Sequence, residues 1–260
     1  RVLKPGGLVQ GGLPADELVS FCGRVLPESS PVMTDNTQVS NTATTFSSVQ
    51  KILRVSVFNA RSIVNKLPEL HQMIYSSTDI DCFCVTETWL NDSITDGLLD
   101  PLSKFTIIRV DRRRAKSGGV CILVSKQFKV VHINLLDTPE NVELLCVDLL
   151  LGQRYRIIVV YRPPSVRPGV TDTDQLMTMT YLVECLEKLC NQFGPTIVVG
   201  DFNCPNIDWY TLLPPSDPIS KKFFDFVVCN GYYQCVLEPT RLNSLLDLIM
   251  VNDQPLISKV

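Results

Sequence analysis

The segment Thr196–Asn203, with the sequence Thr-Ile-Val-Val-Gly-Asp-Phe-Asn, decides the interpretation of the whole chain. Its apolar run predicts a buried β-strand that ends in an acid, Asp201, and an amide, Asn203. Gly200 allows the backbone to turn there or to be approached closely. Because side chains two residues apart on an extended chain face the same way, Asp201 and Asn203 would point toward one reacting group. The alternative interpretation is an Asx-rich turn that only closes the strand.

Polar side chains also follow other apolar strands, at the point where each strand ends. Asn59, Glu87 and Tyr161 occupy such positions. Taken singly, each is explained as a cap, a solvated turn or, for the tyrosine, an interface aromatic. Together with Asp201 they lie where α/β sheets tend to place ligand sites. Two carboxylates at the ends of apolar strands cost less free energy when a hard divalent cation lies between them, which favours Mg²⁺.

Alternating and continuous apolar runs predict nine strands, and 3.6-residue periodicity predicts three helices. The expected strands are Ile52–Phe58, Ile80–Val85, Phe105–Val110, Val120–Val124, Phe128–Ile133, Leu144–Leu150, Arg156–Tyr161, Thr196–Val199 and Leu246–Val251. The expected helices are Val64–Ser76, Asp172–Phe193 and Ile219–Asn230. This α/β mixture fits two stacked sheets with helices outside.

Composition bounds the rest of the interpretation. The chain has 260 residues with a formal net charge of −3, so its overall charge does not attract nucleic acid and any such binding needs a local patch. No apolar run is long enough to cross a bilayer, and we expect no membrane association.

The ten cysteines are scattered through apolar segments and are expected to be reduced; a metal site at Cys82 and Cys84 is the weaker alternative. Residues 1–50 predict a disordered leader or linker, and residues 51–260 one domain.

Five ordered motifs within residues 53–251 resemble the exonuclease–endonuclease–phosphatase superfamily, and most closely the endonuclease domain of LINE-type non-LTR retrotransposons. They are Phe58–Ser62, Val85–Leu90, Gly118–Val120, Val160–Pro164 and Gly200–Asn203. Any one motif is weak, whereas five in order are specific. The resemblance implies a four-layer α/β/β/α sandwich of two mixed sheets.

Residue roles follow from the same resemblance. Glu87 would hold the metal, with Asn59 beside it. Tyr161 and Asn203 would hydrogen-bond the scissile phosphate, and Asp201 would position or deprotonate the attacking water. Two further motifs near the end supply Thr240, expected at the substrate, and Asp247, expected to orient a catalytic histidine; the list of expected catalytic residues is Asn59, Glu87, Tyr161, Asp201, Asn203 and Asp247.

The family's last motif, Ser-Asp-His, would follow the Asp247 motif by a few tens of residues, and the sequence given stops at Val260. We therefore expect the domain to be incomplete at its C-terminus, without its last strand and this segment. Neither His71, on a helical stretch, nor His132, on a strand, substitutes by position.

The segment Lys104–Lys129 holds eight Lys or Arg residues and a single acid. Contact with a phosphate backbone, through Arg112, Arg113, Arg114 and Lys116, is one interpretation. A solvated hairpin turn explains the run equally well.

The leading hypothesis is a DNA endonuclease domain, dependent on Mg²⁺ or Mn²⁺, that nicks double-stranded target DNA and leaves a 3′-hydroxyl primer. A reverse transcriptase domain is expected downstream in the parent chain, and we expect a monomer that is intracellular and acts in the nucleus. One alternative keeps the fold but makes the substrate a small phosphoester. Another is a truncated remnant that catalyses nothing.

Overall fold

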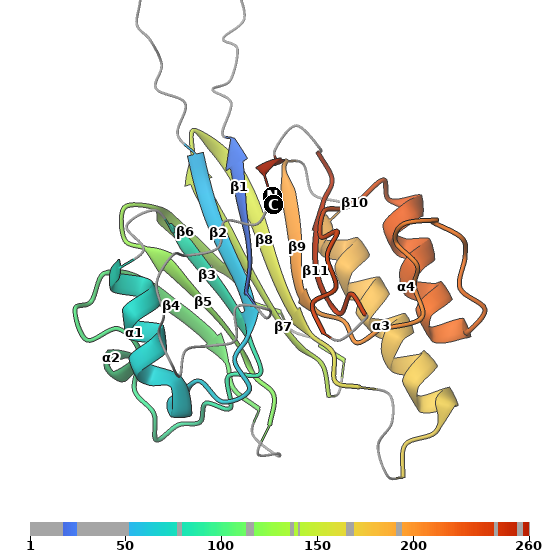
Figure 1. Ribbon diagram of the computed structural model, residues 1–260, viewed down its shortest axis with the longest axis horizontal. Coiled ribbons are helices and arrows are strands. Elements are labelled where there is room, and N and C mark those ends of the chain that lie inside the picture. The colour runs from blue at the N-terminus through green and yellow to red at the C-terminus, as the bar shows by residue number, and fades with distance from the viewer. Residues whose placement is uncertain are drawn as a thin grey trace, which may run out of the picture.

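Two six-stranded sheets lie face to face, with helices on both outer sides (Figure 1). The computed structural model describes residues 18–24, 52–76, 80–112, 117–135, 138–139, 141–164, 169–190, 194–241, 244–253 and 257–259. The expected four-layer α/β/β/α sandwich of mixed sheets is confirmed, because each sheet contains both parallel and antiparallel neighbours.

The first sheet has the strand order β12-β1-β2-β3-β5-β4. Its strands are β1 (Leu18–Arg24), β2 (Ile52–Asn59), β3 (Cys82–Thr86), β4 (Phe105–Val110), β5 (Val120–Ser125) and β12 (Ile257–Lys259). The pair β2 and β3 is parallel, with Asn59 opposite Thr86, so both strands end at the same edge of the sheet.

The second sheet has the order β10-β11-β9-β8-β7-β6. Its strands are β6 (Lys129–Ile133), β7 (Glu143–Leu151), β8 (Gln153–Tyr161), β9 (Thr196–Asp201), β10 (Tyr233–Gln234) and β11 (Asp247–Val251). Here β8 and β9 are the parallel pair, with Tyr161 opposite Asp201, and β11 runs antiparallel to β9, with Asp247 opposite Asp201.

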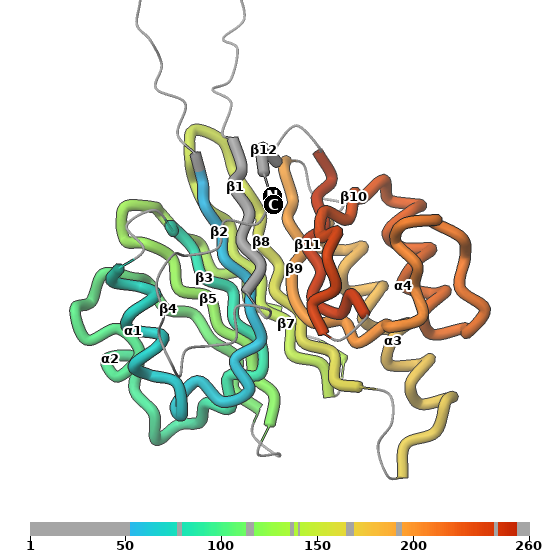
Figure 2. The backbone as a smooth tube through the Cα atoms, in the orientation of Figure 1, coloured from blue at the N-terminus to red at the C-terminus, as the bar shows by residue number. Residues whose placement is uncertain are grey.

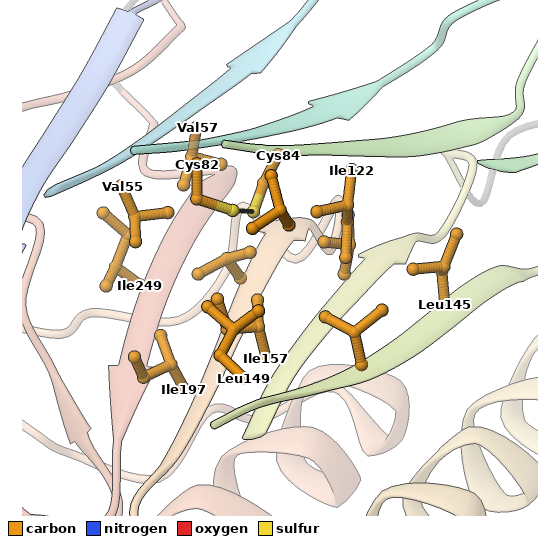
Figure 3. Packing of buried hydrophobic residues seen from close by; sticks show 14 of the residues in the cluster. Val55, Val57, Cys82, Cys84, Ile122, Leu145, Leu149, Ile157, Ile197 and Ile249 are labelled. Carbon is orange, nitrogen blue, oxygen red and sulfur yellow. Dashed lines mark hydrogen bonds between the residues drawn. The ribbon is translucent and has the colours of Figure 1, made fainter. Parts of the chain in front are cut away.

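The central core lies between the two sheets. Alternate residues of each strand point into it, as the two-residue period of a strand requires. From β3, for example, Cys82 and Cys84 point inward, while Phe83 and Val85 point to the helix side. Figure 3 shows the inward side chains of the first sheet facing those of the second, among them Val57, Cys82, Cys84, Ile122, Leu149, Ile157, Ile197 and Ile249. Because both faces of each sheet are covered, the central strands contain continuous apolar runs such as residues 82–85 and 157–160.

Cys82 and Cys84 lie in this core with their Sγ atoms 3.9 Å apart. Burial raises the pKa of the Cys84 thiol, so it stays protonated and apolar. Cys82, Cys84 and seven further cysteines are reduced thiols in this structure.

Helices cover the two outer faces. The helix α1 (Leu67–Ser76), preceded by a 3₁₀ turn at Val64–Lys66 and accompanied by the short α2 (Asp96–Leu99), packs Leu70 and Ile74 on the first sheet. The helices α3 (Asp172–Cys190) and α4 (Pro218–Cys229) cover the second sheet. Figure 2 shows α1 and α2 on one side of the strands and α3 and α4 on the other. None of the helices in the described ranges combines the length and apolar character that a membrane span requires.

All nine expected strands are present, and the three expected helices begin within a few residues of the expected positions. One strand, β1, lies inside the expected disordered leader, and its seven residues pair with β2 from Leu18 opposite Phe58 to Arg24 opposite Ile52. Without β1, one edge of β2 would present unpaired backbone N–H and C=O groups. The rest of residues 1–50 lies outside the described residues, and a leader or linker there remains a prediction.

Candidate active site

Five of the six expected catalytic residues come from strands that end at one edge of the sandwich. Asn59 ends β2 and Glu87 directly follows β3 in the first sheet. Tyr161 ends β8, Asp201 ends β9 and Asp247 begins β11 in the second sheet. The direction of each strand, and the stacking of the sheets, therefore bring together residues that are far apart in sequence.

Asn59 links the two sheets at this edge. Its Nδ2 donates to Glu87 Oε1 at 2.9 Å and to Asp201 Oδ2 at 3.1 Å. Its Oδ1 accepts the backbone N–H of Arg61 at 3.1 Å, which fixes the orientation of the amide. One buried amide thus holds a carboxylate from each sheet.

Glu87 lies on a strained turn. Its φ is +49°, and the loop is held on both sides by backbone hydrogen bonds: its carbonyl accepts the Ser62 N–H, and Trp89 N–H donates to the Gly118 carbonyl. A non-glycine residue at positive φ costs free energy, and such strain gathers at functional sites. The turn aims the half-buried Glu87 carboxylate at Asn59 instead of letting it continue along the strand.

Asp201 is a buried carboxylate beside two others. Burial raises its pKa well above the ordinary value, and the charges of Asp247 and Glu87 raise it further. The Asn203 N–H, which donates to Asp201 Oδ1 at 3.1 Å, and the Asn59 amide oppose this shift. A carboxylate with a raised pKa is a stronger base, which suits removal of a proton from water.

Tyr161 is buried, and its phenol lies near the Glu87 carboxylate. Burial raises the pKa of Tyr161, and the charges of Glu87 and Asp201 raise it further, while Arg112 lowers it. The phenol is therefore protonated at neutral pH and remains a hydrogen-bond donor.

Asn203 differs from its expected arrangement. Its φ is +48°, and its Nδ2 donates to the Arg162 carbonyl at 2.7 Å. The buried Arg162 in turn donates from Nη1 to the carbonyls of Phe202 and Asn203, both at 3.2 Å, and from Nη2 to Gln175 at 3.1 Å. These bonds fix the turn after β9, so the Asn203 side chain holds the backbone in place in this structure.

Thr240 and Asp247 form one local unit. The Thr240 Oγ1 accepts the backbone N–H groups of Leu246 and Asp247, both at 3.1 Å. Thr240, expected at the substrate, thus fixes the start of β11 and with it Asp247.

Neither histidine lies near Asp247. His71 is on α1, with Nε2 2.9 Å from the Leu98 carbonyl oxygen, and His132 is exposed in the middle of the edge strand β6. Both are far from the ends of β9 and β11, as the sequence interpretation expected.

The structure gives Arg112 a different environment from the expected phosphate contact. Its Nε and Nη2 donate to the two carboxylate oxygens of Glu143, and its Cζ lies 5.6 Å from the centroid of the Tyr161 ring. Since the guanidinium is already paired and mostly buried, it does not offer a free charge to DNA in this arrangement. Arg113, Arg114 and Lys116, named with it, lie outside the described residues.

The family model described as endonuclease-reverse transcriptase matches residues 155–259. This stretch contains Tyr161, Asp201, Asn203 and Asp247. Over these residues the chain is similar to the endonuclease-reverse transcriptase family. No curated protein sequence matches the chain.

Solved structures extend the likeness to the whole sandwich. The endonuclease domain of TRAS1, a telomere-specific non-LTR retrotransposon, has a TM-score of 0.52 at 15% identity over 80% of this chain and 93% of that one. The AP endonuclease LMAP of Leishmania major has a TM-score of 0.55 at 14% identity, over 75% of this chain and 77% of that one. The human Nocturnin catalytic domain has a TM-score of 0.52 at 17% identity, over 73% and 75%. At these identities the likeness shows the fold alone, which this chain shares with these proteins.

A divalent cation fits the donors that lie together at this edge of the two sheets. Glu87 and Asp201 are carboxylates held by one amide, and their mutual repulsion contributes to the raised pKa of Asp201. Within the described ranges, no three His, Cys, Asp or Glu side chains are grouped as a complete cage. Mg²⁺ commonly uses one or two carboxylates and keeps several waters, so the Glu87 carboxylate is a suitable ligand, and Asn59 beside it orients that carboxylate through Nδ2.

The sequence interpretation missed Glu143 and Gln175. Glu143 begins β7, opposite Tyr161 on β8, and Gln175 lies in the first turn of α3. Neither belongs to a motif, and only their three-dimensional contacts with Arg112 and Arg162 identify them.

Proposed function

We propose that this chain is a metal-dependent DNA endonuclease domain of a retrotransposon polyprotein, which nicks target DNA and leaves a 3′-hydroxyl primer for reverse transcription. The observation that carries the proposal is the Asn59 bridge between Glu87 and Asp201, with the buried Tyr161 near both carboxylates. The match of residues 155–259 to the endonuclease-reverse transcriptase family supports DNA as the substrate.

Each side chain has a role that its environment supports. Asp201 orients the attacking water and accepts its proton, because the raised pKa makes it a better base. Asn59 keeps Asp201 and Glu87 at a fixed separation. Tyr161, protonated at neutral pH, donates to a non-bridging phosphate oxygen and stabilises the charge that develops there. Asn203 acts through the backbone turn that places Asp201, and Thr240 places Asp247.

The cation would be held by Glu87, with Asn59 beside it. When bound, Mg²⁺ or Mn²⁺ supplies positive charge to the phosphate and to the leaving 3′ oxygen. It would also reduce the repulsion among Glu87, Asp201 and Asp247, which the buried position of Asp201 makes costly.

The cellular setting belongs to the same proposal. A domain that prepares a primer would be followed by a reverse transcriptase in the parent chain, would act as a monomer on double-stranded DNA, and would work in the nucleus. The expected Ser-Asp-His segment would supply the histidine that Asp247 orients.

Supercoiled-plasmid nicking with Mg²⁺ tests the proposal. The chain, and a version extended through the expected Ser-Asp-His segment, are compared with Asp201→Ala and Tyr161→Phe variants of each. Asp208→Ala is the matched control, because Asp208 is exposed and bonds only within its own turn, to Tyr210 and Thr211. We expect nicking by the wild type and Asp208→Ala, and a loss of about 100-fold or more in the other two. An extended wild type that nicks no faster than Asp201→Ala would refute the proposal.

The product distinguishes an endonuclease from a hydrolase of small phosphoesters. An endonuclease leaves nicks that DNA polymerase extends directly, without prior phosphatase treatment. A small-molecule phosphatase would leave the plasmid supercoiled and release inorganic phosphate from nucleotides or inositol phosphates.

A further inference from the structure

We propose that Arg112 and Glu143 form a clamp across the two sheets that positions the Tyr161 ring, so that Arg112 is a positioning residue and not a phosphate contact. This inference rests on the proposed function, since it assigns to Tyr161 the role of donor to the phosphate.

The clamp joins the two sheets at the edge where the active site lies. Arg112 follows β4 of the first sheet, and Glu143 begins β7 of the second. The two side chains form a bidentate pair, and Arg112 Nη2 also donates to the Asn141 carbonyl at 2.9 Å. A planar guanidinium matches a carboxylate in this way, whereas a lysine ammonium would make one contact.

Tyr161 lies between the clamp and the metal-binding carboxylate. Its backbone pairs with Glu143 across β7 and β8, and its ring centroid is 5.6 Å from Arg112 Cζ. Burial and the charge of Glu87 both raise the pKa of the Tyr161 phenol. A cation over a tyrosine ring is attractive and restrains the ring. The clamp thus restrains the Tyr161 ring at the edge where Glu87 and Asp201 lie.

Gly118 and Gly119, just before β5, allow Arg112 and the Glu87 turn to approach the backbone closely. A Cβ at Gly118 would lie 2.6 Å from Arg112 Nε, and a Cβ at Gly119 would lie 2.5 Å from Thr88 Oγ1. The carbonyls of Gly118 and Gly119 also accept the N–H groups of Trp89 and Thr88, next to Glu87. The two glycines therefore place the clamp and the Glu87 turn against each other.

The burial of the pair argues against a DNA contact. The side chains of Arg112 and Glu143 are 10% and 6% exposed, so phosphate could reach the guanidinium only by breaking a buried ion pair. Breaking one partner of such a pair is costly, because the other charge is left buried.

The first test separates positioning from phosphate binding by kinetics. Arg112→Lys and Glu143→Gln are compared with the wild type and with Arg109→Lys, a matched control whose arginine pairs with Asp96 and Asp111. We expect both clamp variants to lower kcat for nicking about 10- to 100-fold with the affinity for DNA unchanged. When Tyr161→Phe is already present, adding Arg112→Lys should lower kcat by less than about threefold, because the phenol that Arg112 positions is absent.

A phosphate contact would give the opposite pattern. Affinity for DNA in EDTA would weaken in Arg112→Lys, the salt slope of binding would fall by about one, and kcat would be retained. That pattern, or equal losses in the wild-type and Tyr161→Phe backgrounds, would overturn the inference.

A second readout does not need activity. In protein labelled with ¹³C-tyrosine, the Tyr161 signal is the one that Tyr161→Phe removes. We expect this signal to shift or broaden in Arg112→Lys and Glu143→Gln and to stay in place in Arg109→Lys. If the wild type fails to nick, the proposed function fails, and the Tyr161 signal still decides whether the clamp positions the ring. An unchanged signal in a folded clamp variant would overturn the inference; Glu143→Gln serves if Arg112→Lys does not fold.

Discussion

Single backbone positions determine how accurately the site is built, and Gly200 shows this most clearly. Its φ is +131°, and a Cβ there would lie 1.9 Å from the Val160 carbonyl oxygen of the neighbouring strand. No side chain can be accommodated without separating β8 from β9, which carry Tyr161 and Asp201. The glycine of this motif is therefore required by packing as well as by its backbone conformation.

We expect Gly200→Ala to lower the free energy of unfolding by about 3 kcal/mol or more, since it combines backbone strain with a direct clash. Urea denaturation monitored by circular dichroism measures the change. Gly97→Ala is the control, because a Cβ at Gly97 meets nothing within 4 Å. Equal stability of the two variants would contradict this account.

The raised pKa of Asp201 predicts a pH dependence of stability with a definite sign. When the pKa of a carboxyl group is higher in the folded chain, folding is favoured at low pH, and this advantage is lost as the pH rises through the raised value. The loss begins above the ordinary value of 3.8. We therefore expect Asp201→Asn to gain stability relative to the wild type as the pH rises from 4 toward neutrality. Its altered hydrogen bonds lower stability by the same amount at every pH and do not change this trend.

Denaturation in EDTA at a series of pH values measures this difference. Asp208→Asn should run nearly parallel to the wild type over this range, because hydrogen bonds from Thr211 lower the pKa of the exposed Asp208 and any change in stability from its titration falls below about pH 4. Parallel pH curves for Asp201→Asn and the wild type would show that Asp201 titrates normally.

At the scale of elements, local sequence pattern was sufficient for most of the fold. The nine strands were predictable because sheets covered on both faces need continuous apolar runs, and α3 was predictable from its apolar period. The short elements α2, β10 and β12 carry too few residues for a period. The strand β1 depends on pairing with β2, which no local pattern contains.

The candidate site divides in the same way. Asn59, Glu87, Tyr161 and Asp201 were predictable because each follows an apolar strand, and strand ends meet at one edge. The roles of Arg112, Asn203 and Thr240 were not, because their partners are set by tertiary contacts: Glu143, the Arg162 carbonyl and the backbone at Leu246. A basic residue in a basic run carries no sign that it is paired.

A buried ion pair of the second sheet also connects that sheet to α3, and it gives a prediction about stability. Arg156 donates to both oxygens of Asp148, at 2.7 and 2.9 Å, and to the Leu189 carbonyl near the end of α3 at 2.8 Å. Arg156→Met should lower the free energy of unfolding by about 3 kcal/mol, because it leaves Asp148 buried with only the longer contact to Arg154.

The double variant Arg156→Met, Asp148→Leu should cost less than Arg156→Met alone, since no buried charge remains. Chemical denaturation of the single and double variants measures the coupling. Lys221→Met, which breaks the exposed pair with Asp225, should change stability by less than about 1 kcal/mol. A double variant less stable than both single variants would contradict this explanation.

At the scale of the whole molecule, each sheet supplies half of the site. Asn59 and Glu87 come from the first sheet, and Tyr161, Asp201 and Asp247 from the second. A cation bound at this edge would therefore stabilise the packing of one sheet against the other. Its binding should raise the free energy of unfolding of the whole domain.

We expect Mg²⁺ to raise the free energy of unfolding by about 1.4 kcal/mol at ten times its Kd, because a ligand that binds only the folded chain shifts the equilibrium by mass action. Thermal denaturation with Mg²⁺ and with EDTA measures the shift. Glu87→Gln should abolish it, and Asp208→Asn should retain it. The gain should grow from pH 4 toward neutrality, because the cation offsets the repulsion that ionisation of Asp201 introduces beside Glu87 and Asp247. If Glu87→Gln retained the gain in stability with Mg²⁺, the cation would bind at another site, away from the edge where the two sheets meet.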